Sequence, residues 1–226
     1  MRTADATRAA LAKLGAGPIS DALGKTSAMD HGIRPRSADA RMAGMAFTLR
    51  VHTADILMVS KALSECPKNY VLVIDGHGEC NTALWGGLTT LAAFRKGLAG
   101  VVVDGAIRDS AEISRSRLPV FARAVVANAG GAEYTGELQI PVQCGGVVVN
   151  PGDWLVGDQD GVVAIPAARL DEAIETAKKI LQAEARIARA IRAGKDMSEI
   201  LKCDEAIERK RKEIFVPQLR ATEGGK

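Results

Sequence analysis

An arginine and two carboxylates follow a run of apolar residues in the stretch VVVDGAIRDSAEI, residues 101–113. The valines at the start of this stretch favour a buried β-strand, and Gly105 allows the chain to turn. Arg108, Asp109 and Glu112 come directly after that strand. Because ligands of α/β proteins bind beyond the carboxyl ends of the strands, these three side chains are candidates for a functional site.

Two interpretations fit the same three residues. In the structural one, Asp109 is the N-cap of a helix and Glu112 occupies its third position, which forms a capping box and leaves Arg108 solvated. In the functional one, Arg108 binds a carboxylate through two hydrogen bonds or stabilises a developing enolate. Asp109 then binds a hard divalent cation. A helix cap explains the carboxylates, but it does not explain an arginine at the exit of a strand.

A glycine pair stands at the start of another predicted helix, in the sequence Trp85-Gly86-Gly87-Leu88. Free backbone N–H groups at a helix start attract anions, and glycine lets a ligand approach the backbone closely. Anion-binding amides, an arginine and a metal-binding carboxylate together describe a site for a 2-oxo acid.

The elements that must position these residues alternate between strands and helices. The helix after the glycine pair is expected to carry Leu88, Leu91, Ala92 and Leu98 on one side. The other expected elements are helices at 1–14, 19–25 and 55–66, strands at 43–51 and 70–75, a glycine turn in DGHGE after the second of these, and short strands over 140–166. Ser20 or Asp21 is the expected cap of the helix at 19–25.

The pattern changes at Ala167, where apolar residues begin to follow a helical stripe. Gly194 ends this stripe, and Asp196 with Glu199 predicts a capping box for a further helix over 197–213. We therefore expect a catalytic α/β domain at 1–166 and a C-terminal helical extension at 167–226. The apolar residues Ile214, Phe215 and Val216 then need a cover, which suggests packing on a neighbouring subunit.

The composition is that of a soluble globular protein, with 47% hydrophobic and 25% charged residues. A net charge of +3, with basic and acidic residues interleaved, argues against nucleic acid or an anionic membrane as partner. No apolar run is long enough for a membrane span. The four cysteines are scattered without a CxxC pair, and the N-terminus has no apolar signal segment, so we expect a reduced, cytoplasmic protein.

The spacing of the site residues resembles that of a known family. Gly87, twenty residues, Arg108-Asp109, two residues and Glu112 form a G-x20-R-D-x2-E pattern. This pattern is similar to the class II pyruvate aldolases that act on 4-hydroxy-4-methyl-2-oxoglutarate and 4-carboxy-4-hydroxy-2-oxoadipate, whose family includes the regulator of ribonuclease activity A. Further similar blocks are ISDAL (19–23), AGMAFTL (43–49), ALWGGL (83–88), GLAGVVVDGAIRD (97–109) and VNPGDWLVGDQDGVVAIP (149–166).

The resemblance implies an αββα sandwich similar to swivelling phosphohistidine domains, assembled as a homotrimer or hexamer with sites between subunits. Asp109 would bind Mg2+ or Mn2+ directly, and Glu112 would support the waters of the metal. Arg108 would be the catalytic contact to the keto oxygen of the substrate. Gly86, Gly87 and Leu88 would line the substrate site, with the amides of Gly87 and Leu88 holding the pyruvyl carboxylate.

The implied reaction is a retro-aldol cleavage of a 4-hydroxy-2-oxo acid, in which pyruvate leaves as its enolate. The metal and Arg108 would stabilise that enolate, so oxaloacetate would also be decarboxylated. Two alternatives stay open: a non-enzymatic protein that inhibits a ribonuclease, and the same site acting on a sugar-derived 2-oxo acid.

One position departs from the family pattern. Aldolases of this family often carry an acidic residue where this chain has Gly87, so the exact substrate and the proton relay are left open. The longer tail resembles the longer aldolases, and a tail glutamate reaching a neighbouring site is one candidate for the relay: Glu184, Glu199 or Glu205.

Other polar residues have structural explanations. His77 fits a turn better than a catalytic role, and Asp158 and Asp160 fit a turn between strands better than a metal loop. Cys80 has no visible base beside it. Asp104 ends a strand, where holding a turn and lying near the site are both open.

Overall fold

The computed structural model describes the backbone of residues 3–219 and the side chains of residues 3–213. The chain divides into two compact units, Met1–Lys179 and Ile180–Lys226. The division falls within helix α6 (Leu170–Arg192), which the 3-10 helix η1 (Ala167–Arg169) precedes. The expected contacts of Ile214, Phe215 and Val216 lie outside the described side chains.

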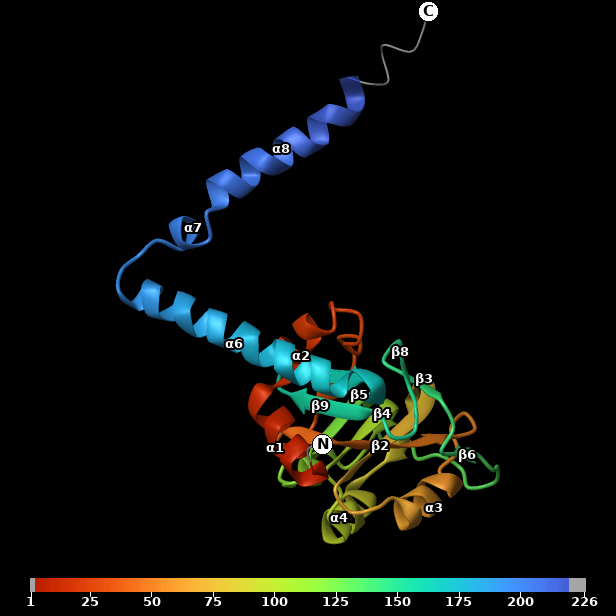
Figure 1. The fold of residues 1–226 in the computed structure, drawn as a ribbon. Helices are drawn as coiled ribbons and strands as arrows, with labels where there is room; N and C mark the ends of the chain where they lie inside the picture. Colours follow the sequence, from red (N-terminus) through yellow and green to blue (C-terminus); the bar gives the residue numbers. More distant parts are fainter. Residues whose placement is uncertain (1–2, 220–226) are drawn as a thin grey trace, which may run out of the picture. The chain divides into compact units, whose positions relative to one another are not determined.

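The first unit is built on a mixed sheet, as Figure 1 shows. Its central pairs, β2 with β3, β3 with β4 and β4 with β5, are parallel, and its outer pairs are antiparallel. The mixed α/β class predicted from the sequence is confirmed, whereas the αββα layering and the likeness to phosphohistidine domains stay expectations. The order is β1 (Arg34–Pro35), β5 (Val120–Val125), β4 (Gly100–Ile107), β3 (Tyr70–Trp85), β2 (Met42–Arg50), β9 (Trp154–Asp158), β10 (Gly161–Ile165), with β6 (Glu137–Leu138) on β2 and a separate pair β7 (Val142–Cys144) and β8 (Val147–Val149).

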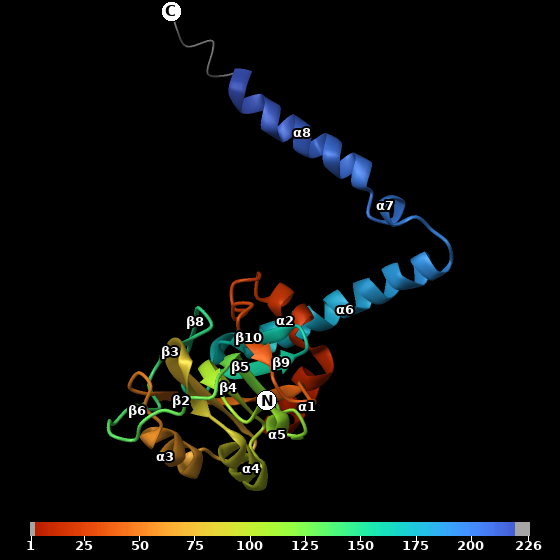
Figure 2. The same cartoon turned by 180° about the vertical axis from the view of Figure 1, so that it is seen from behind.

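Strand side chains alternate between the two faces of a sheet, so the apolar strands of the first unit need cover on both faces. Val101 and Val103 pack in one core with α3 (Leu57–Glu65) and α4 (Gly87–Lys96), which lie side by side in Figures 1 and 2. Val102 packs in the core on the opposite face, which includes the β7–β8 pair. The valine run therefore supplies both cores, as a strand buried on two sides requires.

The strand expected at 70–75 continues much further, to Trp85. The expected closing turn at DGHGE is instead an irregular stretch within β3, where His77 and Gly78 have φ angles of 60° and 70°. The pairing of β3 with β4 shifts register between Asp75 and Trp85, and Trp85 then lies opposite Ile107. The prediction of a turn was wrong, and the consequence is functional: the glycine pair after Trp85 is brought beside Arg108.

Two helix predictions need correction near the chain ends. The helix expected at 19–25 is α2 (Ala16–Ala22), which follows α1 (Ala4–Leu14) after Gly15. Its N-cap residue is Gly15, and the distant Asp158 Oδ2 accepts from the Ala16 amide at 2.7 Å. Neither Ser20 nor Asp21 is the cap, because the helix begins before them.

In the second unit, Asp196 caps a helix as predicted, and its Oδ1 accepts from the Ser198 amide at 2.8 Å. The expected helix over 197–213 is divided into α7 (Met197–Ile200) and α8 (Cys203–Leu219), because Lys202 takes a left-handed φ of 53°. Every helix among residues 3–219 is too short or too polar to span a lipid bilayer.

A buried ion cluster explains Asp104. Arg123 of β5 donates two hydrogen bonds to Asp30, at 2.9 and 2.7 Å, and a third to Asp104 of β4. The other oxygen of Asp104 accepts from the Gly145 amide at 2.8 Å. Asp104 is 5% exposed and lies on the core face occupied by the β7–β8 pair, so it holds structure rather than ligand.

Replacing Arg123 with methionine should lower the free energy of unfolding by about 3 kcal/mol, because the buried carboxylate of Asp104 would lose its charged partner. Urea unfolding at pH 7 measures this, and a loss below about 1 kcal/mol would contradict it. The matched control is Arg169→Met, which removes an exposed ion pair with Glu172 and should change stability by less than about 1 kcal/mol. Hydrogen bonds from Arg123 lower the pKa of Asp30 below its ordinary 3.8. The contribution of ionised Asp30 to the free energy of unfolding is therefore present above that pH and is lost as the pH falls through the lower, folded-state pKa.

Candidate active site

The glycine pair is held by the side chains that follow it. The buried Trp85 Nε1 donates to Thr90 Oγ1 at 2.7 Å, and this hydroxyl donates to the Gly86 carbonyl at 2.8 Å. Thr89 Oγ1 accepts from the Gly86 amide at 2.9 Å. The sequence patterns above did not single out either threonine, although hydroxyl side chains in the first turn of a helix are a known capping signal. Together they fix the start of α4.

Asp109 points across to that helix start rather than capping its own helix. It has a left-handed backbone, with φ 56° and ψ 39°, and its side chain makes no capping hydrogen bond to α5 (Ser110–Ile113). Instead, Asp109 Oδ2 accepts from the Gly87 amide at 2.9 Å. Asp109 does occupy the N-cap position of α5, with Glu112 at the third helical position, but the side-chain hydrogen bond that a capping box requires from Asp109 is absent. A non-glycine residue in this region is uncommon, and such strain gathers at functional sites.

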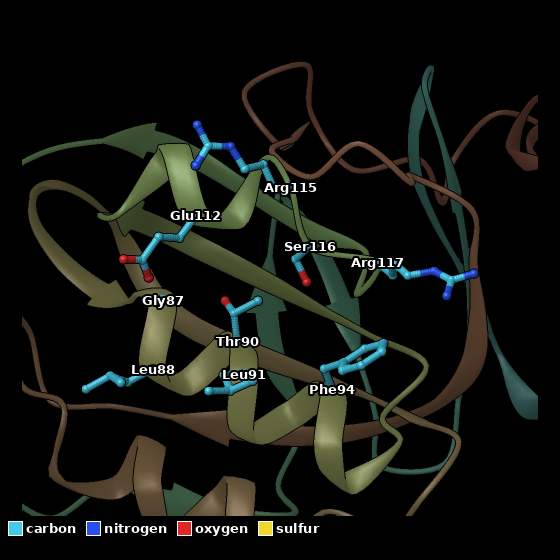
Figure 3. A pocket seen from close by; sticks show the side chains of 9 residues that line it. All are labelled: Gly87, Leu88, Thr90, Leu91, Phe94, Glu112, Arg115, Ser116 and Arg117. Atoms are coloured by element: carbon cyan, nitrogen blue, oxygen red, sulfur yellow. The ribbon is translucent and has the colours of Figure 1, made fainter.

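Because both glycines lack a side chain, the carboxylates of Asp109 and Glu112 can lie close to their backbone. A Cβ atom at Gly86 would lie 2.7 Å from Asp109 Oδ2, and one at Gly87 would collide with Glu112 Oε2. Figure 3 shows the Glu112 carboxylate close to Gly87. Arg108 Nε lies 3.8 Å from Asp109 Oδ2. The structure therefore brings all five of these residues together around the start of α4.

Two pockets meet at this point, and Leu88 lines both of them. We call the first the Arg108 pocket: it has a volume of about 270 Å³, and its lining includes Gly86, Arg108, Asp109 and Ala129. We call the second the Phe94 pocket: its volume is about 380 Å³, and it lies between α4 and the segment around Glu112–Arg117, as Figure 3 shows. A small acid can therefore enter beside Arg108 with further space next to it.

The apolar face of α4 does not point where the sequence suggested. The helix buries Thr90 and Ala93, whereas Leu88 is 83% and Leu91 is 59% exposed, and Phe94 is also exposed. The predicted grouping of Leu88 and Leu91 with the buried Leu98 was wrong, because the buried face of α4 carries smaller residues and Leu98 lies beyond the end of the helix. The exposed leucines leave an apolar surface beside the site.

The residues of the site fit a hard divalent cation. Asp109 is a carboxylate with 40% of its side chain exposed, and Glu112 converges on the same glycine pair. In the part of the chain that the structure describes, no three His, Cys, Asp or Glu side chains gather as a closed metal cage. An ion such as Mg2+, which keeps several waters and uses one or two carboxylates, matches this open oxygen-donor set. Of the two amides expected to face a substrate carboxylate, that of Gly87 donates to Asp109.

The other polar candidates lie elsewhere. His77 Nε2 lies 2.9 Å from the Val51 carbonyl, and neither His77 nor Cys80 lines either of the two pockets. Asp158 Oδ1 accepts from the Asp160 amide at 3.0 Å, so GDQDG is a turn that also binds the start of α2. The tail glutamates considered for the proton relay all lie in the second unit, Ile180–Lys226: Glu184, Glu199 and Glu205.

Comparison with known proteins shows which family the chain belongs to. The sequence model of the RraA-like family, described as Aldolase/RraA, matches residues 16–164. A 4-hydroxy-4-methyl-2-oxoglutarate aldolase of Thermus thermophilus is 37% identical over 148 residues, which cover 66% of this chain and 90% of that protein.

Two solved structures are also similar. The RNA-processing inhibitor RraA from Thermus thermophilus has a TM-score of 0.61 and 37% identity, covering 66% of this chain and 90% of that one. RraAS2 of Streptomyces coelicolor, titled a member of the RNase ES inhibitor RraA family, has a TM-score of 0.71 and 25% identity, covering 82% and 96%. The chain therefore belongs to the RraA-like family, as its G-x20-R-D-x2-E spacing predicted.

Proposed function

We propose that the protein is a divalent-metal-dependent lyase that cleaves a 4-hydroxy-2-oxo acid, of the 4-hydroxy-4-methyl-2-oxoglutarate or 4-carboxy-4-hydroxy-2-oxoadipate type, and releases pyruvate. The observation that carries this proposal is the Asp109 carboxylate, which is directed at the glycine pair with Arg108 beside it on an open pocket. The aldolase name of the relative from Thermus thermophilus supports the substrate class.

Each residue of the site has a task in this reaction. Arg108 donates to the keto oxygen of the substrate and stabilises the negative charge that grows there as the bond breaks. The Gly87 amide holds Asp109, so the backbone amide of Leu88 is left to orient the pyruvyl carboxylate. Bound Mg2+ or Mn2+, held by Asp109 and supported through water by Glu112, would supply Lewis-acid stabilisation of the same charge.

The cleavage involves no net oxidation or reduction, so it needs no redox cofactor. A base removes the proton of the C4 hydroxyl, the C3–C4 bond breaks, and its electron pair passes to the keto oxygen at C2 to form pyruvate enolate. Protonation at C3 then gives pyruvate, and the other half leaves as a second oxo acid. Loss of carbon dioxide from oxaloacetate gives the same enolate, so secondary oxaloacetate decarboxylase activity belongs to the proposal.

We also propose a homotrimer or hexamer with sites between subunits. The exposed Leu88, Leu91 and Phe94 support it, because an apolar surface of this kind beside a polar site is typical of a subunit contact. Sedimentation of the purified protein tests the assembly directly.

A substrate panel tests the proposed function. The metal-loaded protein is assayed for pyruvate with both aldol substrates, oxaloacetate and a sugar-derived 2-oxo acid. Turnover of either aldol substrate supports the proposal. Turnover of the sugar-derived acid alone would support the proposed site but would show that the proposed substrate class is wrong. A folded, metal-loaded protein that releases pyruvate from none of them would overturn the lyase.

The titles of the two similar structures favour a second candidate, an inhibitor that binds a ribonuclease. Such an inhibitor needs no metal site, so its affinity should survive a chelator and the Asp109→Asn change. Biolayer interferometry with RNase ES as the probe, with and without chelator, separates the two functions.

Replacing Gly87 with alanine should weaken Mn2+ binding about tenfold, because the new Cβ would displace the Glu112 carboxylate from its place beside the metal site. Gly87 is not among the residues with positive φ, so the backbone itself accepts alanine. Electron paramagnetic resonance titration of free Mn2+ measures the affinity. Gly17→Ala is the matched control, because Gly17 also lacks a positive φ and its Cβ would meet open space, so the affinity should be unchanged. Unchanged affinity in Gly87→Ala would contradict the role of Glu112.

A further inference from the structure

A segment that we call the strap, residues 126–134, crosses the carboxyl ends of β4 and β3 and reaches the start of α3. It has little regular structure, yet backbone hydrogen bonds tie it along its length. Parallel bridges pair Ala129 with Ala83 and Gly131 with Asp55. The backbone bonds are Val126 N to Ile107 O at 2.9 Å, Ala83 N to Asn128 O at 2.8 Å, Gly130 N to Ala83 O at 3.1 Å, Gly131 N to Ala54 O at 2.9 Å, and Ile56 N to Gly131 O at 2.8 Å.

The strap is one wall of the candidate site. Ala129 lines the Arg108 pocket together with Arg108 and Asp109. The approach to α3 is close, since a Cβ atom at Gly130 would lie 2.7 Å from the Ala54 carbonyl oxygen. Because Ala129 lines the pocket, a displacement of the strap would change the width of the Arg108 pocket.

A buried carboxylate clamps the far end of the strap. Asp55 is 3% exposed, and its Oδ1 accepts from the Leu57 amide at 2.8 Å. Its Oδ2 accepts from the amides of Glu133 at 2.6 Å and Tyr134 at 3.0 Å. Burial opposes ionisation, but these backbone hydrogen bonds outweigh it and lower the pKa of Asp55. The ionised side chain thus joins the start of α3 to the strap.

We propose that Asp55 is a positioning residue for substrate selection: by clamping the strap, it sets the distance of Ala129 from Arg108 and Asp109. This inference rests on the proposed function. If the Gly87–Leu88 end of the pocket receives the pyruvyl carboxylate, the strap faces the remainder of the substrate. A clamped strap then limits the size of the group at C4, which leaves as the second oxo acid.

The first test replaces Asp55 with asparagine, which keeps the shape but exchanges one acceptor oxygen for an amide donor. The ratio of kcat/KM for 4-carboxy-4-hydroxy-2-oxoadipate to that for the smaller 4-hydroxy-4-methyl-2-oxoglutarate should rise about tenfold, because the wall yields to the bulkier C4 group. The kcat for oxaloacetate, which has no such group, should stay within about twofold of wild type.

A double-mutant cycle tests the clamp from its other side. Glu133→Pro removes the N–H that donates to Asp55 Oδ2 and leaves Asp55 in place. It should shift the substrate ratio in the same direction, and the double variant should add little to either single change. Asp153→Asn is the matched control. Asp153 is also a buried carboxylate, and it accepts from the amides of Asn150 and Ala167, but it lines neither pocket. It should lower stability and leave the substrate ratio unchanged.

Hydrogen exchange supplies a readout that does not depend on activity. The amides of Glu133 and Tyr134 should exchange about tenfold faster in Asp55→Asn than in wild type. Unchanged exchange would overturn the clamp. Faster exchange in an active enzyme with an unchanged substrate ratio would overturn the positioning role and leave the proposed function standing. If the wild type cleaves neither aldol substrate, the proposed function fails, and the selection role of Asp55 fails with it.

Discussion

Asp109→Asn should lower kcat/KM for pyruvate release by at least about a thousandfold at saturating Mg2+, the largest effect expected of any single change. In the proposed reaction this carboxylate binds the metal directly, and asparagine keeps its shape while removing the charge. Asparagine also retains an oxygen that can accept from Gly87, so the start of α4 should keep its structure. A coupled pyruvate assay measures the loss.

The control for this change is Asp160→Asn, which removes the same charge from an exposed turn outside both pockets. It should leave kcat/KM within about twofold of wild type. An Asp109→Asn protein that folds and retains more than about a tenth of wild-type activity would contradict the assignment of the metal ligand.

Arg108→Lys should lower kcat about a hundredfold while changing KM much less, because the arginine acts on charge that develops only as the bond breaks. Lysine keeps the positive charge but lacks the planar fork that can contact the keto oxygen and a second acceptor together. Steady-state kinetics with oxaloacetate and with the aldol substrate measure the split between kcat and KM.

Arg95→Lys is the matched control, since Arg95 is exposed in the last turn of α4 and lines neither pocket. Its kinetics should match wild type within about twofold. If Arg108→Lys instead raises KM strongly and keeps kcat, the guanidinium binds the substrate uniformly and does not stabilise the enolate.

The family resemblance predicted that Gly86, Gly87, Arg108 and Asp109 share a site, but the strand expected at 70–75 ended too early to explain how. The observed pairing of the longer β3 with β4 supplies the reason. Trp85 lies opposite Ile107 in that pairing, so the residue after each strand end meets the other. The valine run and the alternation of expected strands and helices likewise predicted a mixed α/β domain.

Other features were not predictable from hydropathy and spacing, because they depend on which hydrogen-bond partners the fold provides. The Asp109–Glu112 spacing fits a capping box, but the partner of Asp109 is the Gly87 amide, twenty-two residues away. The helical stripe through Leu88 and Leu91 looked like a core face, yet Thr90 is buried instead and bonds to Trp85 and Gly86. Both bonds are local, but hydropathy ranks threonine below leucine and so does not reveal which face is buried.

Asp55 shows the same limit more sharply. In the sequence it stands before a helix and resembles an ordinary cap, and its bond to the Leu57 amide fits that view. Its second oxygen binds amides nearly eighty residues further along the chain. A pattern of neighbouring residue types carries no information about that pairing, which arises only when the strap crosses the sheet edge.

The central claim is that this site releases pyruvate through a metal ion held by Asp109. The most direct test is a single series with wild-type protein: pyruvate release from 4-hydroxy-4-methyl-2-oxoglutarate with Mg2+, after excess chelator, and after Mg2+ is restored. We predict activity, its loss and its recovery in that order. Full activity in protein that metal analysis shows to be free of divalent ions would contradict the claim, as would no activity from folded protein saturated with Mg2+ or Mn2+.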